Sequence, residues 1–206
     1  MDGKGLGLIS IRYNSIILFS ERVTILSDMK YAAQIFLVLL LFGTTSCRPV
    51  SVLELGQTLE LATAAESKVD VTINLTRDES GQFILSATFT PEVLDMHLYS
   101  KEIPVNGVDG LGRPTLLELA EDSALKANGE LTESVLSSQA PLDSNGLLLY
   151  PAGPVTLSLP VLLPEGNNWI NDEVIVTYMA CDNQGCRAPV QQKPIAIKIP
   201  STGLFQ

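Results

Sequence analysis

Two cysteines, Cys181 and Cys186, are separated by the four residues Asp-Asn-Gln-Gly. These are turn-forming residues that tolerate the backbone angles of a tight reversal. Cysteines that flank such a turn can face each other at disulfide distance without movement of the backbone. The spacing therefore predicts a disulfide-capable pair, whose sulfurs either exchange with other thiols or staple the turn.

The length of the closed loop bears on these two alternatives. A bridge that closes about six residues removes only roughly 2 kcal/mol of unfolded-state entropy on the chain-entropy model. The positive charge of Arg187, next to the second cysteine, would favour the thiolate form that exchanges. These observations favour thiol–disulfide exchange, while a structural hairpin disulfide stays open. A zinc site is disfavoured because the chain has no second cysteine pair and a single, distant histidine, and we expect no metal and no cofactor.

The elements around the turn have the pattern of β-strands. Residues 173–179 and 193–200, on either side of the cysteines, alternate and are rich in β-branched side chains. Further strands are expected at 69–75, 83–89, 96–103, 115–119 and 155–163, with Pro160 marking an edge or a bulge. Short strands at this spacing predict an all-β fold, an immunoglobulin-like β-sandwich. Only 120–128 is expected to be helical, and 129–153 to be a long loop.

The third cysteine, Cys47, follows a different pattern. A short basic stretch at 29–31 precedes an apolar run at 32–42 and then small residues up to Cys47. This arrangement is typical of a secretion signal, and the apolar run is too short to span a bilayer as a helix. It resembles a bacterial lipoprotein signal in which Cys47 is lipidated, although Thr44 stands where an apolar residue is usual. Cleavage nearby by ordinary signal peptidase is the alternative.

Either form of processing implies that the body of the protein lies outside the cytoplasm, where disulfides form. We therefore expect a membrane-anchored lipoprotein of the cell envelope, facing the periplasm or the exterior. Residues 1–28 are interpreted as a gene-model extension upstream of Met29, with a second amphipathic anchor as the less favoured alternative. Residues 29–46 are the expected signal, 47–67 a linker, and 68–206 a single domain.

The charge of the chain limits its partners. The formal net charge is −10, and four basic and three acidic residues precede Cys47, so the remaining 160 residues carry −11. An acidic body without a basic patch argues against nucleic acid and against anionic lipid surfaces as partners.

Four segments together carry a family resemblance. They are His-Leu-Tyr-Ser-Lys-Glu-Ile-Pro at 97–104, Gly-Arg-Pro-Thr at 112–115, Tyr-Pro-Ala-Gly-Pro-Val-Thr-Leu at 150–157, and the cysteine turn at 178–189. In this order and spacing, residues 68–200 resemble the N-terminal periplasmic domain of the thiol:disulfide interchange protein DsbD. The resemblance implies an immunoglobulin-like sandwich that receives electrons from a thioredoxin-like domain and passes them to oxidised envelope proteins.

The resemblance also implies roles for particular residues. Cys181 and Cys186 would be the redox pair, with Cys186 forming the mixed disulfides, and Tyr99 would lie near the active site. We expect His97 to face away from Tyr99, as a surface or core residue rather than a proton carrier. Tyr178 and Trp169 are expected to be packing aromatics.

The chain departs from the family pattern in two ways. Residues 141–149 contain no Phe, Tyr or Trp to cap the disulfide, so either Leu147–Leu149 substitute for the aromatic cap or the disulfide is uncovered. The family's transmembrane and thioredoxin-like domains are not in this sequence, so the electron donor must be another polypeptide, a thioredoxin-like protein or a membrane thiol reductase. The alternative from another class is a non-catalytic β-sandwich lipoprotein, for binding or envelope structure, that keeps the disulfide as a staple.

Overall fold

The computed structural model describes residues 54–139 and 147–205, all within one compact unit, Val50–Gln206. Residues 1–53, which include the expected signal and Cys47, lie outside the described residues. The described part contains strands β1 Thr58–Glu66, β2 Val69–Arg77, β3 Phe83–Pro91, β4 His97–Leu98, β5 Leu116–Leu119, β6 Lys126–Ala127, β7 Thr132–Glu133, β8 Ser138–Gln139, β9 Leu148–Leu149, β10 Val155–Leu162, β11 Trp169–Tyr178, β12 Ala180–Asp182, β13 Gly185–Cys186 and β14 Val190–Pro200, then a 3-10 turn, Thr202–Phe205. This part of the chain has no helix with the length and apolar character that crossing a bilayer requires.

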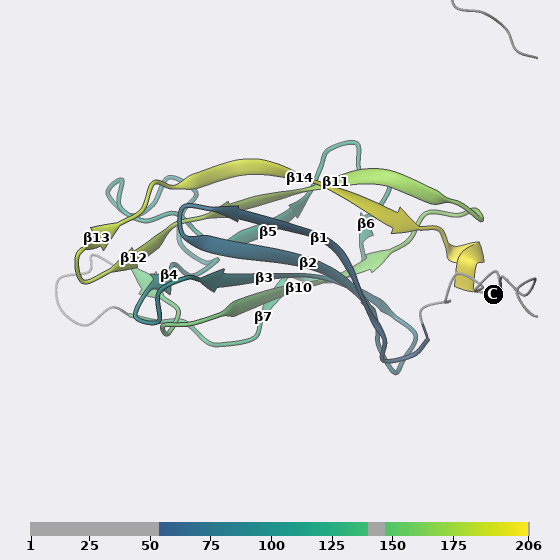
Figure 1. Cartoon of the computed structure of the whole chain (residues 1–206), viewed down its shortest axis with the longest axis horizontal. Helices are drawn as coiled ribbons and strands as arrows, with labels where there is room; N and C mark the ends of the chain where they lie inside the picture. Colours follow the sequence, from purple (N-terminus) through teal and green to yellow (C-terminus); the bar gives the residue numbers. More distant parts are fainter. Residues whose placement is uncertain (1–53, 140–146, 206) are drawn as a thin grey trace, which may run out of the picture. The chain divides into compact units, whose positions relative to one another are not determined.

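The strands form two main antiparallel sheets that face each other (Figure 1). One sheet has the order β1-β2-β3-β10-β6, with β7 also paired to β10, and the other has the order β14-β11-β5. Every second residue of β2 and of the end of β14 is buried, and these side chains belong to one shared core. Two antiparallel sheets around one core are the architecture of an immunoglobulin-like β-sandwich, so the predicted fold class is confirmed.

The prediction of a linker at 47–67 is wrong for residues 58–66, which form strand β1. β1 pairs with β2 from Thr58↔Thr76 to Glu66↔Val69, and the two strands are joined through Ser67 and Lys68, both with positive φ. The sandwich therefore begins before residue 68. The pattern was weak because β1 is rich in alanine, which has little intrinsic preference for strands.

The expected helix at 120–128 is also wrong. The segment forms a turn and then β6, which pairs with Val161 and Leu162 of β10. The Oδ2 of Asp172 accepts hydrogen bonds from the Ser123 hydroxyl (2.9 Å) and the Ala124 amide (3.1 Å). These tertiary bonds occupy groups that a helix would have used, so the tertiary context overrides the local helix preference.

Smaller corrections concern the loops. The expected loop at 129–153 contains the short strands β7, β8 and β9, and of the expected strand 96–103 only His97–Leu98 pairs as β4. Pro160 lies in β10 between the residues paired with β7 and those paired with β6. The Pro160 carbonyl accepts a hydrogen bond from the Asn128 amide (2.8 Å) in the gap between β7 and β6. Because neither strand pairs with residue 160, the N–H that proline lacks is not needed there.

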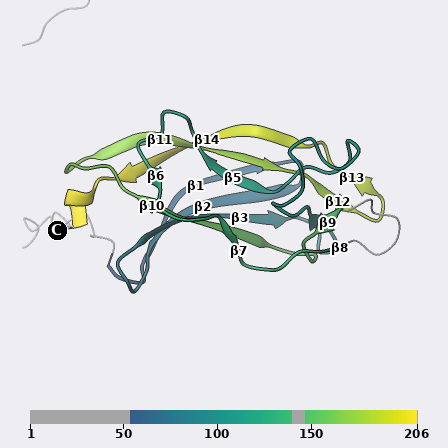
Figure 2. The ribbon, with the colours of Figure 1, turned by 180° about the vertical axis from the view of Figure 1, so that it is seen from behind.

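A third, small sheet positions the cysteines. It has the order β13-β12-β4 and lies at one end of the sandwich, where β12 and β13 form the tip (Figure 1). The view from behind shows β8 and β9 at the same end (Figure 2). The chain runs from core strand β11 directly into β12, so the cysteine hairpin is a continuation of the sandwich rather than a separate loop.

Candidate redox site

Cys181 and Cys186 lie opposite each other in the β12–β13 ladder and are joined by a disulfide, with their Cα atoms 4.0 Å apart. The turn between them is organised by Asp182, whose Oδ1 accepts from the amides of Gln184 (2.9 Å) and Gly185 (3.0 Å). Gly185 has φ +139°, a conformation that favours glycine. The Asp-Asn-Gln-Gly sequence thus provides both the turn-organising carboxylate and the flexible residue before the second cysteine.

The two cysteines differ sharply in exposure. Cys181 is only 3% exposed and belongs to a small buried cluster with Tyr99 and Ile103, whereas Cys186 is exposed at the hairpin tip. A thiolate arriving from solvent therefore meets Cys186 first. Cys181 would be the sulfur released into the protein.

Tyr99 directly follows β4, and its side chain reaches the disulfide. Its hydroxyl lies 3.1 Å from Cys181 Sγ and 3.7 Å from Cys186 Sγ. Its backbone is fixed because its carbonyl accepts both the amide (3.1 Å) and the hydroxyl (2.7 Å) of Thr115. Burial raises the pKa of Tyr99, so the phenol keeps its proton and can donate to a sulfur.

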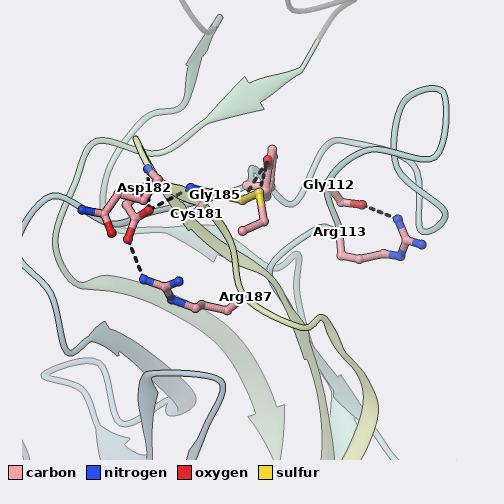
Figure 3. Close-up of a disulfide and its surroundings, with 9 residues drawn as sticks. Gly112, Arg113, Cys181, Asp182, Gly185 and Arg187 are labelled. Atoms are coloured by element: carbon pink, nitrogen blue, oxygen red, sulfur yellow. Dashed lines mark hydrogen bonds and ion pairs between the residues drawn. A yellow bond between two sulfur atoms is a disulfide. The ribbon is translucent and has the colours of Figure 1, made fainter.

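Arg187 pairs with the turn rather than standing free beside the sulfur. Its Nη2 donates to Asp182 Oδ2 (Figure 3), at a distance of 2.7 Å. The Asp182 side chain is only 6% exposed. Its amide also donates to the Ala180 carbonyl at 2.9 Å. The positive charge expected to act on Cys186 is thus largely compensated by Asp182, and the pair braces the hairpin.

His97 does not face away from Tyr99, contrary to the expectation from the sequence. The two rings are in edge-to-face contact, with centroids 5.9 Å apart, because residues two apart along a strand share a face. In the β4–β12 ladder, His97 also lies directly opposite Cys181. Burial lowers the pKa of His97, and the negative charge of Asp182 opposes this shift, so the ring is neutral at pH 7.

Leucines cover the inner side of the disulfide. Leu147, Leu148 and Leu149 pack against the cluster of Tyr99, Ile103 and Cys181, as do Val108 and Met179. The sequence leaves open whether leucines or nothing cover the disulfide. The inner sulfur, on Cys181, is covered by Leu147–Leu149. The outer sulfur, on Cys186, remains exposed.

The packing role expected of Tyr178 is confirmed, whereas Trp169, at the start of β11, is only partly buried. Tyr178 is buried, packs edge-to-face on Phe89 with centroids 5.4 Å apart, and donates its hydroxyl to the Glu66 carbonyl at 3.2 Å. Burial raises its pKa to about 12. Tyr178 is therefore a packing residue that anchors β11 next to the hairpin.

Two residues of the site were missed by sequence reasoning, Asp182 and Gly112. Asp182 had a recognisable signal, because an aspartate that opens a turn commonly accepts from the amides two and three residues on. Gly112 belongs to a segment noted only for its resemblance, and its contact with Tyr99 is a tertiary one. Within 54–139 and 147–205, no three His, Cys, Asp or Glu side chains are grouped to hold a metal ion.

No family model and no curated protein matches the sequence. Among solved structures, the chain is similar to the reduced N-terminal domain of DsbD from Neisseria meningitidis, at 10% sequence identity. The similarity covers 68% of this chain and 82% of the other, with a TM-score of 0.34.

Proposed function

We propose that this domain performs thiol–disulfide exchange outside the cytoplasm through Cys181 and Cys186. The observation that carries the proposal is the asymmetry of the disulfide: Cys186 is exposed, while Cys181 is buried against the Tyr99 hydroxyl. Exchange requires one accessible sulfur that a partner thiolate can attack and a second sulfur that leaves readily. The hairpin presents these two properties on different cysteines.

The exchange proceeds in two steps. A partner thiolate attacks Cys186 Sγ, forming a mixed disulfide, and the Cys181–Cys186 bond breaks with its electron pair passing to Cys181. The Tyr99 hydroxyl donates a hydrogen bond to the Cys181 thiolate that results. The partner's second thiol, as a thiolate, then attacks the partner's own sulfur in the mixed disulfide and releases Cys186. The partner has lost two electrons to the domain.

The reduced domain can pass these electrons on by the reverse sequence. The Cys186 thiolate attacks a disulfide of an oxidised envelope protein, and Cys181 then resolves the mixed disulfide. The electron donor would be a thioredoxin-like protein or a membrane thiol reductase. Lipid anchoring through Cys47, in a cell-envelope lipoprotein, would hold the domain near such a donor.

The noncovalent contacts of the hairpin argue against a stapling role. The turn is already held by the Asp182–Arg187 ion pair, by the amides of Gln184 and Gly185, and by the Arg187 amide on Ala180. A disulfide across so short a loop adds only about 2 kcal/mol on the chain-entropy model. The hairpin therefore has other contacts that can hold it in the reduced form.

A redox titration tests this proposal. The full-length chain carrying Cys47→Ser is equilibrated in thiol–disulfide buffers, and thiol alkylation reports the state of the pair. A midpoint potential above about −300 mV is expected, because structural disulfides usually lie below that value. A potential below it would favour the binding or structural lipoprotein with a stapling disulfide. Cys181→Ala in the same background should show no two-electron transition and serves as the control.

A further inference from the structure

The loop between Pro104 and Arg113 folds back on itself next to the disulfide. Val108 and Leu111 exchange backbone hydrogen bonds of 2.9 Å, and the two residues between them, Asp109 and Gly110, both have positive φ. Gly112 follows this turn and is buried. The turn therefore directs the backbone of Gly112 toward the cluster that contains Tyr99.

Gly112 lies against the Tyr99 ring with no room for a side chain. A Cβ at this position would lie 2.9 Å from both Cδ1 and Cε1 of Tyr99 and 3.2 Å from Cδ1 of Ile103. Gly112 also has φ +73°, which favours glycine. The neighbouring Gly110 has φ +81°, but nothing lies within 4 Å of a Cβ built there. The two glycines thus share a backbone requirement and differ in their contact with Tyr99.

Arg113 holds this backbone in place. Its Nη1 donates to the carbonyls of Asn106 (3.0 Å) and Gly110 (3.2 Å), and also to that of Gly112 (Figure 3). On the other side of Arg113, Pro114 forms a β-bridge with Tyr99. The amide and the hydroxyl of Thr115 both donate to the carbonyl of Tyr99. The segment 112–115 therefore fixes both the backbone and the ring of Tyr99.

We infer that Gly112, held by Arg113, is a positioning residue that sets the Tyr99 hydroxyl against the leaving sulfur of Cys181. This inference rests on the proposed exchange reaction. The hydroxyl is 3.1 Å from Cys181 Sγ and 3.7 Å from Cys186 Sγ, so a ring displacement of a few tenths of an ångström changes which sulfur it contacts. A side chain at 112 must displace the ring or the loop, and either movement weakens the hydrogen bond to the departing thiolate.

The test is the rate at which excess dithiothreitol reduces the disulfide in the full-length chain carrying Cys47→Ser. Gly112→Ala should slow the reduction about tenfold to a hundredfold, the effect of losing one hydrogen bond to a charged group. Gly110→Ala is the matched control, because it places the same side chain at a positive φ in open space, and its rate should stay within about twofold of the parent. Tyr99→Phe should slow the reduction as much as Gly112→Ala does.

The double variant Tyr99→Phe with Gly112→Ala separates positioning from general damage. If Gly112 acts through the hydroxyl, the double variant reacts no more slowly than Tyr99→Phe alone. A parental rate in Gly112→Ala, or the same fold-loss from Gly112→Ala with Phe at 99, would overturn the inference. If Gly112→Ala does not fold, Arg113→Gln loosens the loop without adding a side chain at 112. That variant should slow reduction with Tyr at 99 but not with Phe, and equal losses in both backgrounds would overturn the inference.

Dithiothreitol is not a biological partner, so this test and the test of the relay function can fail separately. A chain that forms no mixed disulfide with a thioredoxin-like protein, yet shows the Gly112 effect, retains the positioning role and loses the relay. A chain that relays electrons without any Gly112 effect retains the proposed function and loses only the positioning role.

Discussion

The Tyr99 hydroxyl lies 3.1 Å from the Sγ of Cys181, the buried half of a disulfide whose other half is exposed. The two residues are 82 positions apart in the sequence and are brought together by the pairing of β4 with β12. A protonated phenol beside a buried sulfur stabilises the thiolate form of that sulfur. In the proposed exchange, this contact therefore favours attack at Cys186 and departure of Cys181.

The ion pair between Asp182 and Arg187 should affect both stability and exchange. Arg187→Gln leaves the nearly buried Asp182 carboxylate unpaired, which should lower the free energy of unfolding by about 1 kcal/mol or more. Lys68→Gln breaks the Lys68–Glu92 pair, whose side chains are 59% and 43% exposed, and is expected to cost less than about 0.5 kcal/mol. Urea unfolding of the oxidised proteins measures both values, and equal losses would contradict the bracing role.

Arg187→Gln should also slow attack on the disulfide by anionic thiols. Without Arg187, the uncompensated charge of Asp182 repels an incoming thiolate at Cys186, so reduction by glutathione should become slower and more salt-dependent. The double variant Asp182→Asn with Arg187→Gln removes both charges and should recover much of the parental rate. A double variant as slow and as salt-dependent as Arg187→Gln would show that charge is not the cause.

His97 predicts a pH effect on stability. Burial lowers its pKa below the usual 6.5, so the unfolded chain binds the proton more readily than the folded chain does. The stability that depends on neutral His97 is therefore present above pH 6.5 and is lost as the pH falls toward the folded-state pKa. His97→Gln should lose less stability than the parent between pH 7.5 and pH 5.5. Identical losses, measured by denaturant unfolding, would contradict this prediction.

The anchor at Cys47 is a prediction from sequence alone. In a bacterial host, the parent chain should fractionate with membranes and incorporate labelled lipid. Cys47→Ala should either release the protein from membranes or leave it unprocessed, because the acceptor sulfur is lost. Equal membrane fractionation and equal lipid labelling of the two proteins would rule out lipidation at Cys47.

The strands that the sequence predicts well are those with one face in the core. In β2, β3, β10 and the C-terminal half of β14 the buried residues recur at every second position, so the pattern and the burial have the same cause. β1 lacks this regular pattern, because its alanines pack only partly against the core, and the sequence therefore predicts a linker there. The helix expected at 120–128 failed because Asp172, 49 residues from Ser123, provides the hydrogen bonds.

In the candidate site, too, local features are predictable from the sequence and contacts between distant segments are not. The cysteine pair is local, because the turn residues between the cysteines organise their own hairpin. Tyr99 was placed near the cysteines only by resemblance, since its contact depends on the pairing of distant strands. The packing of Gly112 on a ring 13 positions earlier has no local signature, because a glycine in a turn-rich loop is ordinarily explained by its backbone conformation.

Trapping of a mixed disulfide tests the central claim most directly. Cys181→Ala and Cys186→Ala variants of the full-length chain, each with Cys47→Ser, are incubated with an oxidised thioredoxin-like protein and separated by non-reducing electrophoresis. Cys181→Ala keeps the exposed Cys186 and should form a covalent adduct that dithiothreitol dissolves. Cys186→Ala keeps only the buried Cys181 and should form far less. No adduct from either variant, or more adduct through Cys181 than through Cys186, would contradict exchange at the hairpin tip.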